Sequence, residues 1–408
     1  MPRPPRLRRL APRSSRSAVN AMTLSGPELR RYARQIVLPG LGTDGQERLR
    51  ASSVLIVGLG GLGSPAALYL AAAGIGRLGL VDADVVDDTN LHRQILHGTP
   101  HVGLAKTDSA RARLAELNPH VTLEVHQEQF TAANAVRLVR QYDVILDATD
   151  NFGTRYTVND ACVLSARPNV YASVHRMEGQ LSVFATLGGP CYRCLYPEPP
   201  ADGTVPNCAE GGVLGVVPGI LGAAQAAEAI KLITGIGEPL VGRLFLLNVG
   251  SMQSRTVKLT RNPGCPACGS KPRIRAAGDG IVADGNIAAH YLAGCTPPEP
   301  MELEFEILPS ELAARRSAGE PLTVIDVRED WEFAIAHLEG ATLVPLSTLV
   351  NAERGIAREG ELIVYCHHGV RSARAAEYLR SCGITGARSL AGGIDRWSLE
   401  IDPTVPRY

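Results

Sequence analysis

The sequence predicts an α/β protein with two domains, the larger of them in the amino-terminal part of the chain. An apolar strand at 54–58 leads through a glycine-rich turn into a helix at 65–74, and another strand follows at 77–82. This order is typical of a parallel sheet with crossover helices. Two further strands, at 322–329 and 361–369, lie beyond a segment rich in Gly, Ala and Pro, and they indicate a second, smaller α/β domain.

The composition is that of a folded globular protein. The chain has 408 residues, of which 45% are hydrophobic and 20% charged, and its formal net charge is zero. This length suits two or three domains, and the charge balance argues against nucleic acid as a partner. No apolar run reaches the roughly 18 residues needed to span a membrane, so we expect no membrane partner. Nine cysteines without a secretory signal indicate reduced thiols for metal binding or catalysis in a cytoplasmic protein.

Changes in composition along the chain set the expected domain boundaries. Residues 1–22 are rich in Arg and Pro and lack acidic residues, so we expect a disordered basic tail. A transit peptide, or a true start at Met22, is the alternative for this segment. The first domain is expected at 23–270, a linker at 271–302 and the second domain at 303–408.

The other elements of the first domain continue the α/β pattern. A capped helix with three Arg begins after Leu24, and a third apolar strand at 143–151 collects polar residues at its carboxyl end. In open parallel sheets, ligands bind at the carboxyl ends of the strands. Apolar strands at 180–186 and 243–249, with an Ala- and Ile-rich helix at 219–233 between them, complete the domain.

The glycine-rich turn is a candidate phosphate-binding loop. Gly58, Gly60 and Gly63 have the spacing G-x-G-x-x-G between a strand and a helix, and Asp82 ends the next strand. Glycines let the backbone approach phosphates, the helix N-terminus favours an anion, and the acid can bind ribose hydroxyls. The pattern alone fits NAD as well as ATP, and a turn used only for packing is the structural alternative.

Charged residues further along the domain favour a triphosphate. Arg93 and Lys106 are cations that can neutralise phosphates while a phosphorus atom is attacked. Asp150, after the third strand, offers carboxylate oxygens of the kind that Mg²⁺ prefers. Each residue alone is more often a solvated surface charge, but we expect all three at strand ends on one edge of the sheet.

Several motifs of the first domain resemble those of the MoeB/ThiF family, bacterial relatives of the ubiquitin-activating enzymes. The motifs occur in order over 24–270 and read RYARQIVL, GLGGLGS, VDADVVDDTNLHRQ, VGLAK, LDATDN and RMEGQLSVF. The resemblance implies a Rossmann-like adenylation domain with a mixed sheet and a structural zinc ion. It also implies ATP-dependent adenylation of the C-terminal glycine of a small ubiquitin-like sulfur carrier that ends in Gly-Gly.

The resemblance also implies roles for individual residues. Arg34 matches a family arginine that reaches the nucleotide of the neighbouring subunit, which implies a homodimer with shared sites. Attack of the carrier carboxylate on the α-phosphate gives an acyl-adenylate, a step that requires orientation and charge stabilisation but no covalent enzyme residue. The positions matched to ATP are Gly61, Asp82, Thr89, Asn90, Leu91, His92, Arg93, Lys106, Asp150 and Asn151.

Two C-x-x-C pairs are candidate zinc ligands. Cys191 with Cys194, and Cys265 with Cys268, offer four thiolates for a tetrahedral Cys₄ site. No ligand position is left for water, so the zinc would be a structural clamp between distant segments. A redox dithiol is the alternative, although the strand-to-helix context of that motif is missing. The MoeB/ThiF resemblance implies zinc at the same four positions.

Cys208 lies in a Pro- and Gly-rich loop and has two interpretations. The residues alone favour an incidental thiol. Some members of the MoeB/ThiF family use a cysteine here as a second nucleophile or resolving thiol, whereas others work without it. Cys208 is therefore kept as a candidate catalytic residue beside the incidental interpretation.

The second domain carries a candidate sulfur nucleophile. An apolar strand delivers Cys366 into the loop CHHGVR at the start of a helix, where backbone N–H groups favour a thiolate. This loop, with IDVREDWEFAIAHLEGATLVPL upstream, resembles the rhodanese family over 303–408. The resemblance implies sulfur carried as a persulfide on Cys366 and a donor cradled by the loop and Arg371. Asp326 and Arg328 match the D-x-R that supports this loop in rhodaneses.

Together the two domains resemble the MoeZ-type adenylyltransferase/sulfurtransferases and their eukaryotic counterparts. The expected reactions are adenylation of the carrier, attack by the Cys366 persulfide with loss of AMP, and reduction of the acyl disulfide, in which Cys208 can take part. The cofactors are ATP, Mg²⁺ and one structural zinc, and the sulfur donor is thiosulfate or a cysteine desulfurase persulfide. Molybdopterin, thiamine, cysteine and tRNA thiolation all remain open as the pathway.

Three other functions stay open from the sequence. One is adenylation alone, with the rhodanese-like domain serving a separate sulfur pathway. Another is an NAD-dependent oxidoreductase with an accessory sulfur domain, which would not release pyrophosphate from Mg-ATP. The third is a scaffold that binds carriers without activating them, against which intact Arg93, Lys106 and Asp150 argue.

Overall fold

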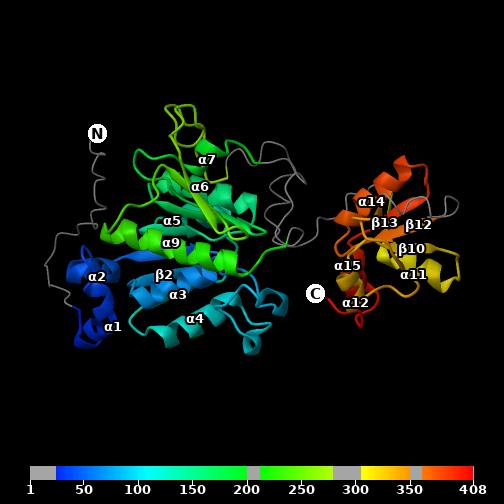
Figure 1. The fold of residues 1–408 in the computed structure, drawn as a ribbon, viewed down its shortest axis with the longest axis horizontal. Helices are drawn as coiled ribbons and strands as arrows, with labels where there is room; N and C mark the ends of the chain where they lie inside the picture. Colours follow the sequence, from blue (N-terminus) through cyan, green and yellow to red (C-terminus); the bar gives the residue numbers. More distant parts are fainter. Residues whose placement is uncertain (1–23, 200–211, 279–304, 350–360, 408) are drawn as a thin grey trace. The chain divides into compact units, whose positions relative to one another are not determined.

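The computed structural model describes residues 24–199, 212–278, 305–349 and 361–407. The chain forms two compact units, Met1–Leu292 and Ala293–Tyr408, whose folds are drawn in Figure 1. The predicted basic tail, Cys208 and most of the predicted linker lie outside the described residues. At the start of that linker, Ile274 and Ala277 are buried in hydrophobic clusters of the first unit.

The first unit is built on a mixed sheet of eight strands in the order β3-β2-β1-β4-β5-β6-β7-β8. The strands from β3 to β5 are parallel, and β6 to β8 continue the sheet in antiparallel pairs. This arrangement confirms the predicted mixed sheet. The strands are β1 (Ser53–Val57), β2 (Arg77–Val81), β3 (Thr122–His126), β4 (Val144–Asp147), β5 (Asn169–His175), β6 (Glu178–Phe184), β7 (Arg243–Asn248) and β8 (Gln253–Lys258).

Helices cover both faces of this sheet, with α3, α4 and α9 on one face and α5 and α6 on the other (Figure 1). Because side chains alternate along a strand, Val54 and Ile56 of β1 pack under the first group, and Leu55 and Val57 pack under the second. The helices are α1 (Gly26–Ile36), α2 (Gly42–Ala51), α3 (Gly63–Ala73), η1 (Asp88–Asn90), η2 (Thr99–His101), α4 (Lys106–Leu117), α5 (Ala132–Val139), α6 (Phe152–Ser165), α7 (Tyr192–Leu195) and α9 (Val216–Thr234).

Among the described residues, α9 is the one helix long and apolar enough to cross a membrane. Its packing is that of a core helix, because Leu221, Ala226 and Ala229 belong to the main hydrophobic cluster. The buried Gln225 Nε2 donates to the carbonyl oxygen of Asp147 at 2.7 Å. The apolar composition of α9 is therefore explained by its contacts with the sheet.

Helix α1 packs at the far end of α3 from the glycine turn. Ser25 caps α1 through a capping box, as the sequence predicts. The Tyr32 hydroxyl accepts a hydrogen bond from Nδ2 of Asn118, the residue that ends α4, at 2.8 Å. Gln35 Nε2 donates to the carbonyl oxygen of Ala73, the last residue of α3, at 3.1 Å.

The second unit has a smaller, parallel sheet of five strands in the order β11-β10-β12-β13-β9. Helix α14 packs on one face, and α11 and α15 pack on the other. This confirms the predicted second α/β domain. Its elements are β9 (Glu306–Ile307), α11 (Pro309–Ser317), β10 (Thr323–Asp326), α12 (Asp330–Ile335), β11 (Thr342–Leu343), β12 (Leu362–Tyr365), α14 (Val370–Ser381), β13 (Ala387–Leu390) and α15 (Gly393–Glu400).

The order of the strands places the carboxyl ends of β1, β2 and β4 side by side. Gly58 follows β1, Asp82 follows β2, and residues 148–151 follow β4. Gly58 has φ of +93°, and a Cβ there would lie 2.8 Å from the carbonyl oxygen of Ala148. A Cβ on Gly63 would collide with the Gly58 carbonyl. Glycine is required at both positions because the backbone segments approach so closely.

Candidate functional site

Asp82 holds the glycine turn from the end of β2. Its Oδ2 accepts the N–H of Leu59 at 2.7 Å, and its Oδ1 accepts the N–H of Asp84 at 2.9 Å. Burial raises the pKa of Asp82, while the charge of Lys106 acts in the opposite direction. Asp82 and the glycine turn, which the sequence motif predicts to belong to one site, are thus in direct contact.

Lys106 is the buried cation at this edge of the sheet. It is the first residue of α4, only 5% exposed, and its Nζ lies 2.8 Å from Oδ2 of Asp84. Burial acts against its positive charge, but the carboxylates of Asp82, Asp84 and Asp150 outweigh burial and raise the pKa of Lys106. Lys106 therefore stays charged within electrostatic reach of all three acids.

Arg93 follows η1 and is held by its own segment. Its Nη2 donates to Oδ1 of Asn90 at 2.6 Å, and its Nη1 donates to Nε2 of His92 at 2.7 Å. Burial, and then the charge of Arg93, lower the pKa of His92 and keep the ring neutral. A Cβ on Gly61 would lie 3.5 Å from Cγ of Arg93, so this segment lies against the glycine turn.

Asp150 and Asn151 lie between β4 and α6. Asn151 is the N-cap of α6, because its Oδ1 accepts the N–H of Thr154 at 2.8 Å. Asp150 is exposed at the same edge of the sheet. On the neighbouring segment, Thr89 donates its backbone N–H to Asp87 at 2.8 Å, and Leu91 is half-buried.

Arg34 does not lie beside the other predicted ATP-site residues of its own chain. It is exposed in the last turn of α1, which packs at the far end of α3. Helix α3 has 11 residues, so at about 1.5 Å per residue roughly 16 Å separate its two ends. The ATP-site residues predicted from the sequence thus gather at one edge, whereas Arg34 lies away from it.

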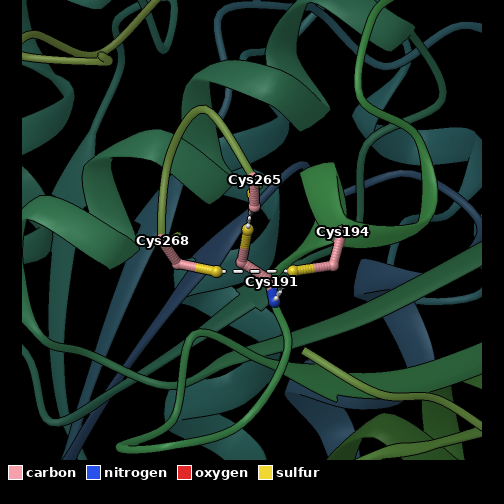
Figure 2. A group of neighbouring side chains, drawn as sticks. All are labelled: Cys191, Cys194, Cys265 and Cys268. Atoms are coloured by element: carbon pink, nitrogen blue, oxygen red, sulfur yellow. Dashed lines mark hydrogen bonds between the residues drawn. The ribbon is translucent and has the colours of Figure 1, made fainter. Parts of the chain in front are cut away.

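The two C-x-x-C pairs converge on one point, as Figure 2 shows. The four sulfur atoms lie within 4.8 Å of one another, with 3.5 Å between Cys191 and Cys265 and 3.4 Å between Cys194 and Cys268. Tetrahedral zinc with Zn–S bonds of about 2.3 Å separates its sulfurs by about 3.8 Å. These distances fit a Cys₄ zinc site and are too long for disulfide bonds.

The charge of these thiols also suits a metal cation. Hydrogen bonding with Cys191 lowers the pKa of Cys265, and the same contact raises the pKa of Cys191. In the absence of a cation, four adjacent thiolates would repel one another. The four thiols therefore differ in how readily they lose their protons. A divalent cation would stabilise all four thiolates together.

A buried ion pair fixes the first C-x-x-C turn to α6. Arg193 lies between Cys191 and Cys194, and its Nε and Nη2 each lie 2.8 Å from a carboxylate oxygen of Asp160. The two side chains are 3% and 0% exposed. This pair was not predicted from the sequence, because nothing local connects the two positions.

Cys366 lies directly after β12, in the second unit. It is 1% exposed, and its Sγ accepts the N–H of Gly369 at 3.2 Å. Gly369 has φ of +94° and precedes the first residue of α14. The carbonyl of Cys366 accepts the N–H of Ile394 at 2.9 Å, so α15 also holds this loop. The predicted position of the thiol at a helix N-terminus is what the structure shows.

Two histidines follow Cys366 in the loop. The rings of His367 and His368 are stacked, with centroids 4.0 Å apart. Burial lowers the pKa of His367 to about 4, so this ring is neutral at neutral pH. Nδ1 of His368 lies 3.8 Å from Oδ2 of Asp395.

Arg371 is held by a carboxylate that the sequence analysis did not single out. Its Nη2 and Nη1 donate to the two oxygens of Glu332 at 2.6 and 2.7 Å. Burial disfavours the charge of Glu332, but the hydrogen bonds from Arg371 outweigh burial and lower its pKa. Arg371 therefore lies beside the loop as half of an ion pair.

Asp326 and Arg328 form a second, fully buried ion pair. Nη2 of Arg328 lies 2.6 Å from Oδ2 of Asp326, and both side chains are 0% exposed. Nη2 also donates to the carbonyl oxygen of Ala336 at 2.7 Å. The pair therefore ties the end of β10 to the end of α12.

Comparison with known proteins gives a family match for each of the two units. The model of the ThiF family matches residues 32–267, and that of the rhodanese-like domain matches residues 308–400. The chain belongs to the ThiF family. Its second unit is a rhodanese-like domain, so it is a ThiF-family protein with a carboxy-terminal rhodanese-like domain.

Two-domain relatives cover nearly the whole chain. The probable adenylyltransferase/sulfurtransferase MoeZ of Mycobacterium tuberculosis is 44% identical over 400 residues, 95% of this chain and 97% of the relative. The adenylyltransferase and sulfurtransferase MOCS3 of Drosophila yakuba is 41% identical, over 94% of this chain and 86% of the relative. This ThiF-family protein is therefore an adenylyltransferase and sulfurtransferase, and neither an oxidoreductase nor a scaffold is favoured.

Solved structures support the fold of the first unit. Escherichia coli MccB, in a crystal structure with ATP, covers 59% of this chain and 74% of its own, with a TM-score of 0.53 at 24% identity. PaaA covers 59% of this chain and 76% of its own, with a TM-score of 0.51 at 28% identity.

We predict that Cys268→Ser removes bound zinc and destabilises the first unit. Zinc binding by four thiolates contributes directly to folding, by roughly 10–16 kcal/mol in small zinc peptides, so loss of one ligand should lower the melting temperature by several degrees. Metal analysis and thermal unfolding of purified protein measure the two effects. Cys382→Ser, the same change in a cysteine outside the cluster, should leave both unchanged. Full stability and undiminished metal in Cys268→Ser would contradict a structural zinc site.

A further prediction concerns the buried pair in the rhodanese-like domain. Arg328→Ala leaves the carboxylate of Asp326 buried without its partner and should cost about 3–5 kcal/mol. Hydrogen exchange of β10 and β12 measures this loss in the intact chain. Arg396→Ala removes a surface pair with Glu400 and should cost only about 0.5 kcal/mol. Equal protection in the two variants would contradict the prediction.

Proposed function

We propose that this enzyme adenylates the C-terminal glycine of a ubiquitin-like sulfur carrier ending in Gly-Gly and then converts it to a thiocarboxylate. The observation that supports the proposal best is the presence of two separate reactive centres on one chain. One is the edge of the sheet with Asp82, Lys106 and Asp150, and the other is the buried thiol of Cys366. The first suits phosphate chemistry and the second suits sulfur chemistry.

The first unit would bind Mg-ATP at the carboxyl ends of β1, β2 and β4. The glycine turn and the N-terminus of α3 would take the phosphates, and Asp82 would take the ribose hydroxyls. Lys106 and Arg93 would stabilise charge on the phosphates, and Asp150 would hold Mg²⁺. The carrier carboxylate attacks the α-phosphorus, the bond to the β-phosphate breaks, and pyrophosphate leaves.

The second unit would supply the sulfur. A donor such as thiosulfate gives its outer sulfur to the Cys366 thiolate, which forms a persulfide and releases sulfite. The terminal sulfur of the persulfide then attacks the acyl-adenylate carbonyl, and AMP leaves. In the resulting acyl disulfide, a thiol such as Cys208 attacks Sγ of Cys366, which releases the thiocarboxylate and forms a Cys208–Cys366 disulfide. A cysteine desulfurase persulfide is the alternative donor.

The location of Arg34 supports a homodimer with shared sites. Helix α1 packs at the far end of α3 from the glycine turn of the same chain. Arg34 would therefore act on the nucleotide of a second subunit rather than on its own. We place the enzyme in the cytoplasm, where thiols stay reduced, and the thiocarboxylate in molybdopterin synthesis or a related sulfur pathway.

The decisive prediction separates the two reactions. Cys366→Ser should leave carrier-dependent ATP–pyrophosphate exchange near the wild-type rate but abolish thiosulfate:cyanide sulfurtransfer, because serine cannot carry a transferable sulfur. Asp150→Ala should lower the exchange rate about 100-fold or more and leave the sulfurtransfer unchanged. Thiocarboxylate formation, measured as a gain of about 16 mass units on the carrier (oxygen replaced by sulfur), should fail in both variants.

Matched substitutions control for nonspecific effects. Glu116→Ala removes an exposed carboxylate at the opposite end of α4 from Lys106, and Cys382→Ser removes a thiol elsewhere in the second unit. Both should keep exchange, sulfurtransfer and thiocarboxylate formation. The assay needs thiosulfate as sole donor, because free sulfide could attack the adenylate directly. Undiminished thiocarboxylate formation by Cys366→Ser under these conditions would rule out the persulfide mechanism.

The shared-site prediction is tested by mixing variants. Arg34→Ala and Asp150→Ala should each be inactive in adenylation alone, whereas mixed dimers should recover activity, because one of their two sites retains both residues. ATP–pyrophosphate exchange measures the recovery after subunit exchange has been verified by differential tagging. No recovery in verified mixed dimers would show that each site is completed within one chain.

A further inference from the structure

His97 lies behind the glycine turn and uses both of its ring nitrogens. Nε2 lies 3.0 Å from the carbonyl oxygen of Leu59, and Nδ1 lies 3.0 Å from Oγ of Ser109. A carbonyl oxygen only accepts hydrogen bonds, so Nε2 carries the proton and donates to Leu59. Burial lowers the pKa of His97 and favours the neutral ring, whose Nδ1 accepts from the Ser109 hydroxyl.

The peptide groups of Leu59 are held on both sides. Leu59 lies between Gly58 and Gly60 and is fully buried. Its N–H donates to Oδ2 of Asp82 at 2.7 Å, and its carbonyl accepts from His97. These two bonds fix the orientation of the peptide groups at the start of the glycine turn.

On its other side, His97 contacts the helix that carries the buried lysine. Ser109 lies one turn after Lys106 in α4, and it is 1% exposed. His97 itself is 8% exposed. The imidazole therefore bridges two parts of the phosphate-binding edge, the glycine turn and the first turn of α4.

We propose that His97 is a positioning residue for the nucleotide, which holds the Leu59 carbonyl, and with it the glycine turn, in the orientation that ATP requires. The proposal rests on the proposed binding of ATP at this edge. His97 acts through Leu59 and contacts no reacting atom. Without it, the Leu59 carbonyl keeps, among the residues that the structure describes, only the long contact to Oγ of Ser64, at 3.4 Å.

Two substitutions at His97 separate its two hydrogen bonds. The Nε2 amide of glutamine can replace the imidazole Nε2, so His97→Gln can still donate to Leu59. The Oδ1 of asparagine can replace Nδ1, so His97→Asn can accept from Ser109 but cannot reach Leu59. We expect His97→Asn to raise the Kd and KM for Mg-ATP about tenfold, the scale of one buried carbonyl left without its donor. His97→Gln should stay within about threefold of the wild type.

The measurements are Mg-ATP binding by calorimetry and carrier-dependent ATP–pyrophosphate exchange. The kcat at saturating ATP should change much less than KM, because no reacting group is removed. Thiosulfate:cyanide sulfurtransfer by the second unit of the same preparation should be unchanged, which verifies the concentration of folded enzyme. Ser109→Ala removes the partner of Nδ1 from the other side and should raise KM about threefold.

Several outcomes would overturn the positioning role. These are wild-type affinity for ATP in His97→Asn, or an equal loss in His97→Asn and His97→Gln. If His97→Asn does not fold, an unchanged KM in Ser109→Ala decides against the proposal. A wild-type enzyme that binds no Mg-ATP would instead overturn the proposed function.

Discussion

The constraint on which both units depend is the common direction of their parallel strands. Parallel strands all end at the same edge of a sheet, so residues that follow different strands are brought together there. In the first unit this edge collects Gly58, Asp82 and Asp150. In the second unit Cys366 follows the central strand β12. The two reactive centres that we propose thus arise from the same geometric rule, applied once to a phosphate-binding edge and once to a reactive thiol.

The proposed nucleotide-binding edge of the first unit depends on a backbone of fixed orientation. The peptide of Leu59 is bonded through its N–H to Asp82 and through its carbonyl to His97. Lys106 is kept charged in a buried position by carboxylates on neighbouring segments. Stabilisation of phosphate charge, the role that we propose for this edge, depends on groups oriented before the substrate binds. Contacts between β2, α4 and the glycine turn supply that orientation here.

Outside the reactive edges, buried polar contacts hold loops to the framework. The Arg193–Asp160 pair fixes one half of the cysteine cluster to α6, and the cluster joins this turn to the segment after β8. In the second unit, Arg328–Asp326 ties β10 to α12 in the same way. Each pair is costly to bury and costly to break, so each makes one loop conformation strongly preferred.

The features that depend on local patterns were predictable from the amino-acid sequence. Apolar runs, the G-x-G-x-x-G turn, the C-x-x-C pairs and the CHHGVR loop predicted two α/β domains, the sulfur cluster and the position of Cys366 at a helix N-terminus. Spacing within a few residues is enough for these features, because strand ends and helix starts are set locally. The chain order of the strands also indicated that polar strand ends would gather on one edge.

Which side chains complete those patterns depends on long-range packing and was visible only in the folded chain. His97 meets Leu59 across 38 residues and Arg371 meets Glu332 across 39. The distance of Arg34 from the glycine turn of its own chain depends on how α1 packs against α3. An isolated buried histidine or glutamate carries no periodic signal, since its partner is chosen by the packing of distant elements. Local patterns therefore fix where chemistry can occur, and long-range packing fixes the residues that orient it.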